Sequence, residues 1–517
     1  MAKNLEIFAS LYGEVNTYYV DEVNPNKLIR TSINAMLEKL DPYTVYIPED
    51  DIEDFRTNAT GEYGGIGIQS NKIKEQHVVL NIYENSPAST AGIKIGDVIT
   101  AVDGVRLGNL TDDQAGKLMK GQSGSDIQIE VIRNGNEKLS FTTTREKITI
   151  PNISYSTLMD ESIGYLRLSE FTNDAADDVK KTVLDLKKQG AKELIIDLRE
   201  NPGGLLNEAV DICNLFVTKG SKIVDTKGKI EAQSHSYTAK AEPLDLDIPI
   251  AVIINHNSAS ASEIVSGVIQ DYDRGVIIGQ KSYGKGLVQV SRKLSFNSQL
   301  KVTTAKYYIP SGRCIQALDY AHRTSDGSAT KVADSLKTKF YTSNNRLVYD
   351  GGGIDPDILI KEPSPSSYTK NLAESNLIFD YATKYYYEND SIAAPQVFEL
   401  TDAEYQDFIN WMSTKTFKNP SQVENTLELL EEAATDDDVY HNLIAEIEGI
   451  TASVEKIKSN GLITFKPEIK TLLEKHIILR YYYTSGVVEA ALYKDQEIKE
   501  ARKILSDSEA YITLLKG

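Results

Sequence analysis

Apolar residues near the start of the chain recur every three or four positions. The series covers residues 5–15 and resumes over residues 28–40. Such spacing lines up one apolar face along an amphipathic helix. Because proline restricts the residue before it, we expect helical structure over residues 4–40 that ends at Asp41-Pro42.

In the middle of the chain, short apolar runs alternate with helical patterns. Residues 250–254 form an uninterrupted apolar run, and residues 194–198 form one interrupted only by Asp197, as in strands that are buried on both faces. A helical pattern follows each run, and another extends from an expected N-cap at Asn173 to Gln189. The alternation over residues 149–362 predicts an α/β core of strands joined by crossover helices.

The last third of the chain changes character. Strand signals largely vanish after residue 365, while helical spacing persists at positions such as Leu427, Leu430 and Ala434. We therefore expect a separate all-helical domain over residues 363–517. Its tyrosine clusters are typical of half-buried core positions.

Residues 61–147 carry an ordered set of turn signals at residues 64–68, 86–93, 96–99 and 102–104, and Thr111 is the expected N-cap of a helix through Met119. Together these signals resemble a PDZ domain. In such a domain the glycine-rich loop leaves backbone N–H groups free to hold the terminal carboxylate of a peptide, which adds as a strand to the sheet edge. Taken singly, the glycines would only shape turns, but their order favours the PDZ interpretation. The peptide-binding loop predicted here consists of Gly65, Ile66, Gly67 and Ile68.

Composition limits the function classes. A chain of 517 residues predicts three to four domains, and its net charge of −19 argues against nucleic-acid binding. Cys213 and Cys314 do not form a disulfide framework. The six histidines are scattered, so we expect neither a metal nor a cofactor. No apolar run approaches the length that spans a bilayer.

Ser260 and Lys285 carry the expected chemistry. Ser260 opens a helical pattern directly after the apolar run 250–254, where helix N–H groups would point towards it. A serine needs a base to become a nucleophile, and a lysine can be that base if burial keeps its amine neutral. Glycines on both sides of Lys285 would let the backbone approach Ser260. The pair predicts peptide-bond hydrolysis by a serine–lysine dyad.

The surroundings of this pair resemble the active site of the carboxyl-terminal processing proteases, also called tail-specific proteases. That family has a Ser-Ala-(Ser/Ala)-Glu stretch, and here the serine three positions before Glu263 is Ser260. A Gly-Lys-Gly-x-x-x-Gln stretch follows at the family spacing, with 25 positions between Ser260 and Lys285. The phrase at residues 40–44, Leu-Asp-Pro-Tyr-Thr, resembles the amino-terminal segment of the same family.

The resemblance implies further roles. Gln289 would accept a hydrogen bond from the Lys285 amine and orient it. Ala261 and one glycine, either Gly203 or Gly204, would donate the two N–H groups of an oxyanion hole. The core would adopt the α/β spiral shared with crotonase-like enzymes.

Three other motifs compete with this interpretation. Ser282-x-x-Lys285 fits the penicillin-recognising enzymes, but that motif lies on a helix, which the flanking glycines disfavour. Residues 279–286 nearly match a phosphate-binding loop but lack its final Ser or Thr. His256 lies near Ser260 in sequence, and no third member of a triad is evident.

The sequence thus predicts a multidomain α/β protein that acts as an exported bacterial serine endopeptidase. It would cut protein substrates near their C-termini after the PDZ domain binds the tail, and a catalytically idle PDZ scaffold is the rival. We expect a periplasmic or otherwise exported location, with the signal segment absent from this chain. Dimerisation and adaptor binding both stay open for the helical tail. The expected domains are a helical segment (1–60), the PDZ domain (61–147), the protease core (148–362) and the helical domain (363–517).

Overall fold

The computed structural model describes residues 2–325, 327–361, 364–419, 421–437 and 439–516. The chain divides into two compact units, each described here by itself. The first unit comprises Met1–Gly61, Ser156–Leu359 and Lys503–Gly517. The second comprises Glu62–Tyr155 and Ile360–Arg502.

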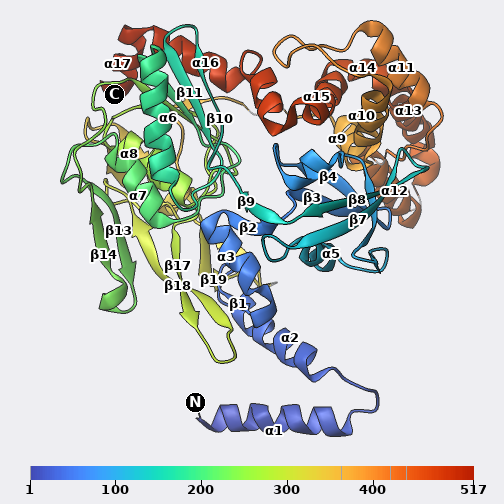
Figure 1. Ribbon diagram of the computed structural model, residues 1–517, viewed down its shortest axis with the longest axis horizontal. Coiled ribbons are helices and arrows are strands. Elements are labelled where there is room, and N and C mark those ends of the chain that lie inside the picture. Colours follow the sequence, from blue (N-terminus) through green and yellow to red (C-terminus); the bar gives the residue numbers. More distant parts are fainter. Residues whose placement is uncertain (1, 326, 362–363, 420, 438, 517) are drawn as a thin grey trace. The chain divides into compact units, whose positions relative to one another are not determined.

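A six-stranded sheet forms the centre of the first unit (Figure 1). The apolar runs recognised in the sequence lie next to each other in this sheet and pair in parallel, which is why they are buried on both faces. The strand order is β10 (Ile153–Met159), β11 (Ile163–Leu168), β12 (Glu193–Asp197), β15 (Ile250–Ile254), β16 (Val276–Gly279) and β23 (Ile358–Leu359).

Three crossover helices pack beside this sheet: α6 (Ala175–Gln189), α7 (Leu206–Asn214) and α8 (Ala261–Asp271). The N-cap of α6 is Asp174, in the left-handed conformation, so the expected cap at Asn173 is wrong by one residue. Every residue of α8 is buried. A helix enclosed in this way fixes the position of whatever residue precedes it.

A second sheet of the first unit brings distant segments together. Its central strand, β18, pairs with the early strand β1 and also with β17, which begins just after the Gly-Lys-Gly stretch. The strands are β1 (Val45–Ile47), β18 (Gln299–Tyr308), β13 (Lys222–Gly228), β14 (His235–Thr238) and β17 (Leu287–Lys293). Two separate two-stranded hairpins belong to the same unit, β19 (Leu318–Arg323) with β20 (Ala329–Lys331) and β21 (Lys339–Tyr341) with β22 (Leu347–Tyr349).

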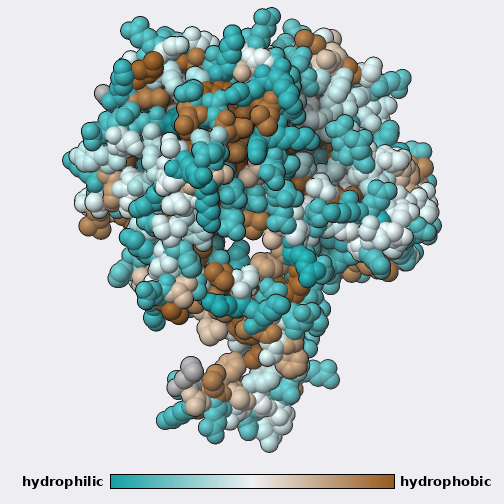
Figure 2. Space-filling view, turned by 60° about the vertical axis from the view of Figure 1, so that its left-hand side comes forward, coloured by the Kyte–Doolittle hydropathy of each residue, from teal (hydrophilic) through white to brown (hydrophobic). Residues whose placement is uncertain are grey.

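The N-terminal segment forms three helices, α1 (Ala2–Tyr18), α2 (Pro25–Glu38) and α3 (Ile52–Thr60). The helical structure expected over residues 4–40 is divided between α1 and α2, because Pro25 opens α2 with Asn24 as its N-cap. No residue of α1 is buried, and its apolar side chains show on the surface at the bottom of Figure 2.

The second unit begins with the β-rich region that resembles a PDZ domain. Thr111 caps α5 (Asp112–Met119) through a capping box, as the sequence predicted. The sheet order is β3 (Ile68–Ile73), β4 (Gln76–Ile82), β5 (Val98–Val102), β7 (Asp126–Arg133) and β8 (Glu137–Thr144). Beside it lie β6 (Val105–Arg106), the pair β2 (Glu62–Gly65) and β9 (Glu146–Thr149), and the short helix α4 (Pro87–Ala91).

The rest of the second unit is helical. Phe379 is buried in the same apolar cluster as the PDZ sheet residues Val79 and Ile99, so the PDZ region and the helices share one core. The helices are α9 (Ser367–Glu374), α10 (Leu377–Glu388), α11 (Asp402–Met412), α12 (Gln422–Asp436), α13 (Tyr440–Ser459), α14 (Gly461–Thr464), α15 (Lys466–Ala491) and α16 (Gln496–Ser506).

The last helix, α17 (Ser508–Lys516), belongs to the first unit. The Tyr511 hydroxyl accepts a hydrogen bond from the backbone N–H of Ile250 at 2.9 Å, which fastens the end of the chain to β15. The segment expected as one helical domain over residues 363–517 therefore contributes its final turns to the protease unit. Across the described residues, every helix is too short or too polar to cross a membrane.

Candidate active site

Ser260 lies on a sharp turn between β15 and α8. It is half-buried, and its backbone is in a strained conformation with φ 56° and ψ −111°, where residues other than glycine are uncommon. The neighbouring turn approaches so closely that only glycine fits at position 203. A Cβ atom there would lie 2.8 Å from the Cβ of Ser260 and 2.6 Å from the Ala259 carbonyl oxygen. Two turns are thus pressed together around the serine.

A single buried carboxylate, Glu263, holds the backbone of both predicted dyad residues. Its Oε2 accepts the backbone N–H of Ser260 at 2.8 Å and that of Lys285 at 2.9 Å. Its Oε1 accepts the Ser282 hydroxyl at 2.5 Å and the Gly284 N–H at 2.7 Å. Burial raises the pKa of Glu263 to about 7, although all four hydrogen bonds favour the ionised form.

Lys285 lies in the irregular segment between β16 and β17, outside any helix. Burial lowers the pKa of its amine to about 8, and the nearby Lys301 acts in the same direction. Glu263 and Asp41 oppose this shift of the Lys285 pKa. No salt bridge involves the Lys285 amine within the described chain. An amine with this pKa is neutral often enough near pH 8 to act as a base.

The Lys285 amine does not form a hydrogen bond with Ser260 in this structure, among the residues described. It lies over the ring of Tyr43, with 4.5 Å between Nζ and the ring centroid. Among the described residues the Gln289 side chain does not accept from this amine either, and its amide N–H donates to the Thr303 hydroxyl at 3.1 Å. The main chains of Ser260 and Lys285 are therefore held by Glu263, whereas the Lys285 amine contacts the Tyr43 ring instead of Ser260.

The turn that contains Gly203 and Gly204 offers one free donor. The Gly203 N–H donates to the Asn201 side chain at 2.9 Å, and that asparagine accepts the Ala259 N–H at its own carbonyl. The backbone N–H groups of Gly204 and Ala261 have no acceptor among the described residues. The geometry leaves these two N–H groups available for an oxyanion.

The four residues of the predicted peptide-binding loop fall into two kinds. Gly65 ends β2 and Ile68 begins β3, so both are in strands. Between them, the N–H groups of Ile66 and Gly67 have no acceptor in the part of the chain that the structure describes. Their carbonyl groups are engaged, by Ala88 and Tyr83 respectively. Among the described strands β3 pairs with β4 alone, so its other edge has no strand beside it.

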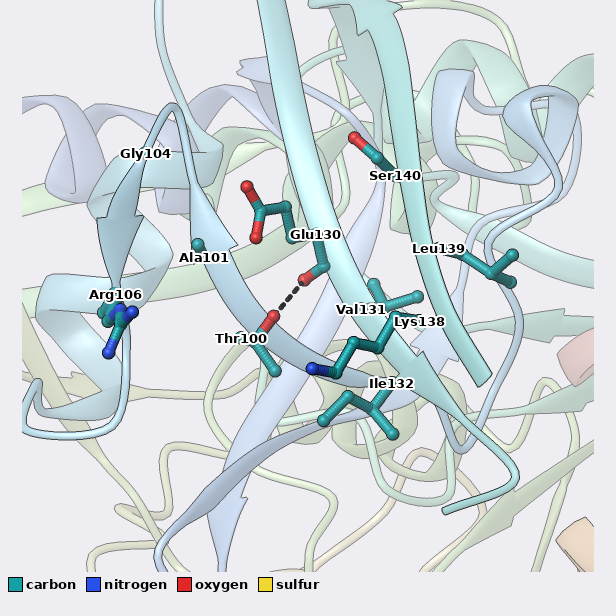
Figure 3. Close-up of a pocket in the computed structure, with 10 residues that line it drawn as sticks. All are labelled: Thr100, Ala101, Gly104, Arg106, Glu130, Val131, Ile132, Lys138, Leu139 and Ser140. Carbon is teal, nitrogen blue, oxygen red and sulfur yellow. Dashed lines mark hydrogen bonds between the residues drawn. The ribbon is translucent and has the colours of Figure 1, made fainter. Parts of the chain in front are cut away.

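A hollow of about 620 Å³ lies elsewhere in the PDZ region, across β5, β7 and β8 (Figure 3). It is lined by Arg106, Glu130 and Lys138, and the Thr100 hydroxyl donates to the Glu130 carbonyl there at 3.1 Å. None of the site residues predicted from the sequence borders this hollow. Within the described residues there is no group of three His, Cys, Asp or Glu side chains able to hold a metal ion.

The competing Ser282-x-x-Lys285 motif does not assemble a site. Ser282 is buried, its hydroxyl donates to Glu263, and it accepts the Ile354 N–H, so it is a structural residue. Arg313 is also buried, and its guanidinium donates to Gln270 and Asp271. Both side chains stabilise the protease unit and are not exposed to a ligand.

Sequence reasoning missed two features of the site. Glu263 served in the sequence only to set the register of Ser260, and its simultaneous contact with both dyad backbones did not follow from the pattern. Tyr43 was quoted only as part of a family phrase, and its contact with Lys285 was not foreseen. The Asp-Pro-Tyr phrase was the available signal, because it breaks the helix and directs the chain back towards the core.

Comparisons with known proteins identify the domains and the family of the chain. The profile of "Peptidase family S41" matches residues 162–360, "PDZ domain" matches residues 64–144, and "Probable PDZ-protease, C-terminal helical domain" matches residues 368–505. A carboxy-terminal-processing protease of Bartonella bacilliformis is 34% identical over 371 residues, which is 71% of this chain and 77% of the relative. A CtpA-like serine protease of Staphylococcus aureus is 31% identical over 448 residues, covering 85% and 84% of the two chains.

Among solved structures, the photosystem II D1 C-terminal processing protease is similar over 69% of this chain and 92% of its own, with 24% identity and a TM-score of 0.37. The chain belongs to peptidase family S41, within the carboxy-terminal-processing proteases. It is a serine protease with a PDZ domain and acts on peptide or protein substrates, which confirms the fold class and the activity predicted from the sequence.

Proposed function

We propose that Ser260 and Lys285 are the catalytic dyad of this protease. The observation that carries the proposal is the shared carboxylate of Glu263, which binds the backbone N–H of both residues and so fixes their main chains beside each other. The burial that lowers the Lys285 pKa to about 8 supports the role of general base. In the reactive arrangement Gln289 turns from Thr303 and orients the amine.

The reaction follows from these positions. The neutral Lys285 amine takes the proton of the Ser260 hydroxyl while the oxygen attacks the substrate carbonyl carbon. The Ala261 and Gly204 N–H groups stabilise the oxyanion. The lysine ammonium then gives its proton to the leaving amine as the peptide bond breaks. Water, activated by the same amine, hydrolyses the ester on Ser260 and restores the serine.

We propose that substrate tails dock on the PDZ region. The terminal carboxylate binds the N–H groups of Ile66 and Gly67, and the tail adds as a strand to the open edge of β3. Fluorescence anisotropy of a tail peptide tests this directly. Binding is expected for the free carboxylate and is expected to be lost for the same peptide with a C-terminal amide.

The dyad is tested by fluorophosphonate labelling and casein turnover in the full chain. Ser260→Ala is expected to abolish both, and mass spectrometry of the labelled protein is expected to find the label on Ser260. Labelling at any other serine would contradict the assignment. Undetectable turnover of every protein substrate by the unmutated chain would favour the idle PDZ scaffold.

We further propose an exported location, on the strength of the family resemblance, and cell fractionation with the full-length gene product tests it. The helical region is proposed as the site of self-association or adaptor binding. Sedimentation of the full chain over a range of concentrations distinguishes a dimer from a monomer, and chemical cross-linking read by mass spectrometry tests whether the contact lies in this region.

A further inference from the structure

Tyr43 is carried on a turn that is fixed to the protease sheet. Asp41, itself buried, accepts the backbone N–H groups of Tyr43 and Thr44 at 2.9 and 2.8 Å. The Thr44 hydroxyl donates to the same aspartate and accepts the Thr303 N–H of β18 at 3.2 Å. Because the turn is held at both ends, the position of the Tyr43 ring is set by the fold.

The ring of Tyr43 faces the loop that carries Lys285. Its hydroxyl lies 3.4 Å from that of Tyr283, two positions before the lysine, and the Tyr320 ring packs edge-on at 6.2 Å. The Lys285 amine lies 4.5 Å from the ring centroid. Tyr43 thus provides the aromatic face on which the amine of the proposed base rests.

An aromatic face attracts the charged form of lysine, because the ring quadrupole is negative above the ring plane. The charged groups that face this amine are Lys301 on β18, Glu263 on α8 and Asp41 on the Tyr43 turn. None of them forms a salt bridge with Lys285 within the described residues. The ring is therefore the direct partner of the ammonium, and the ammonium is the form that cannot act as a base.

We propose that Tyr43 is a positioning residue that competes with Ser260 for the Lys285 amine. With no substrate bound, its ring holds the ammonium away from the serine hydroxyl. When the ammonium loses its proton to solvent water, its attraction to the ring falls, and the neutral amine turns to Ser260 and accepts the hydroxyl proton. This inference rests on the proposed dyad.

The test is the rate at which a fluorophosphonate labels Ser260 in the full chain, measured from pH 6 to 10. Tyr43→Leu keeps an apolar side chain but removes the ring. Loss of a partly desolvated cation–π contact is expected to lower the midpoint of the pH profile by about one unit. Labelling at pH 7 then becomes about fivefold faster, since a midpoint that moves from about 8 to about 7 raises the neutral fraction at pH 7 from about one tenth to about one half.

Two variants separate the ring from other effects. Tyr43→Phe retains the aromatic face and is expected to retain the midpoint of the unmutated chain. Tyr283→Phe removes the partner of the Tyr43 hydroxyl and is expected to do the same. An unshifted midpoint in Tyr43→Leu would overturn the inference, as would a Tyr43→Phe profile that follows Tyr43→Leu.

A second measurement does not depend on reaction at Ser260. The titration of Lys285, followed by carbon NMR after reductive ¹³C-methylation and assigned with Lys285→Arg, is expected to shift downwards in Tyr43→Leu. A shifted titration without labelling of Ser260 would sink the dyad but leave the Tyr43 contact. Labelling of Ser260 with an unshifted titration would sink the Tyr43 inference alone. Circular dichroism checks folding, and Tyr43→Met replaces Tyr43→Leu if the leucine variant is unfolded.

Discussion

The main chain and the side chain of Lys285 are held in contrasting ways. The main chain is bound to a fully buried carboxylate, Glu263, which also binds Ser260. The side chain rests on Tyr43, a ring from a different part of the sequence, through one contact that depends on charge. The main chain of the site is thus fixed in the protein core as a rigid frame, whereas the Lys285 amine, the proposed proton acceptor, can change its contact. Such an enzyme keeps its main-chain geometry while its reactivity changes with the protonation state of the Lys285 amine.

The largest expected effect comes from removing the nucleophile within the rigid frame. Ser260→Ala is expected to lower turnover of casein by at least about 10⁴-fold, with the fold intact. Ser262→Ala is the matched control, because that neighbouring hydroxyl is buried and only donates to the Asn201 carbonyl. Comparable loss of turnover in both variants would contradict a specific role for Ser260.

Lys285→Arg tests the role of the Lys285 side chain, the part of the site that is not fixed by Glu263. A guanidinium stays protonated at all accessible pH values, so turnover is expected to fall by about 10²- to 10⁴-fold. Lys281→Arg is the control, since this half-buried lysine pairs with Asp355 and lies outside the proposed site. Undiminished turnover by Lys285→Arg would exclude the lysine as general base.

Glu263→Gln weakens the frame without touching substrate. The amide keeps one acceptor oxygen and places an NH₂ group against N–H donors, so two of the four hydrogen bonds lose their acceptor. We expect about 2–4 kcal/mol less stability in urea unfolding and a fall in kcat with little change in KM. A variant with unchanged stability and unchanged kcat would show that the frame does not depend on this carboxylate.

The smallest effect is expected at the PDZ loop. A side chain at Gly67 would meet the Ser86 Cβ at 2.4 Å, and the backbone there has φ +79°. Gly67→Ala is therefore expected to distort the loop and raise KM for tailed substrates by about tenfold, the effect of a loss near 1.4 kcal/mol in binding. Fluorophosphonate labelling of Ser260 is expected to stay the same. A slower labelling rate would mean that the loop acts on the dyad as well as on the tail.

Local patterns predicted the parts of the site that lie on one continuous element. The apolar run at residues 250–254 is β15, and Ser260 follows it at the start of α8. Both elements could be predicted because the apolar pattern within each segment shows which of its residues are buried. Thr111 capped its helix for the same reason. The pairing of Ser260 with Lys285 was predicted from the spacing that the family shows, because hydrophobic periodicity carries no information about contacts between separate segments.

Features that depend on contacts between distant segments were not predicted. The ring of Tyr43 against Lys285 requires β1 to pair with β18, and nothing in the local sequence specifies that register. The burial of Phe379 in the PDZ core and the contact of Tyr511 with β15 were not predicted either. Each residue lies in a helix whose own sequence gives no sign of its distant partner. The cap of α6 was misplaced because Asn173 and Asp174 are both good N-cap residues.

The central claim is that the neutral amine of Lys285 activates Ser260, and the pH dependence of Ser260 labelling tests it most directly. Burial lowers the Lys285 pKa to about 8, so the neutral fraction grows as pH rises through that value. The predicted result is a labelling rate that increases about tenfold per unit below pH 8 and levels off above it, with no such midpoint in Lys285→Arg. A flat profile, or a midpoint near 8 that persists in Lys285→Arg, would contradict the account.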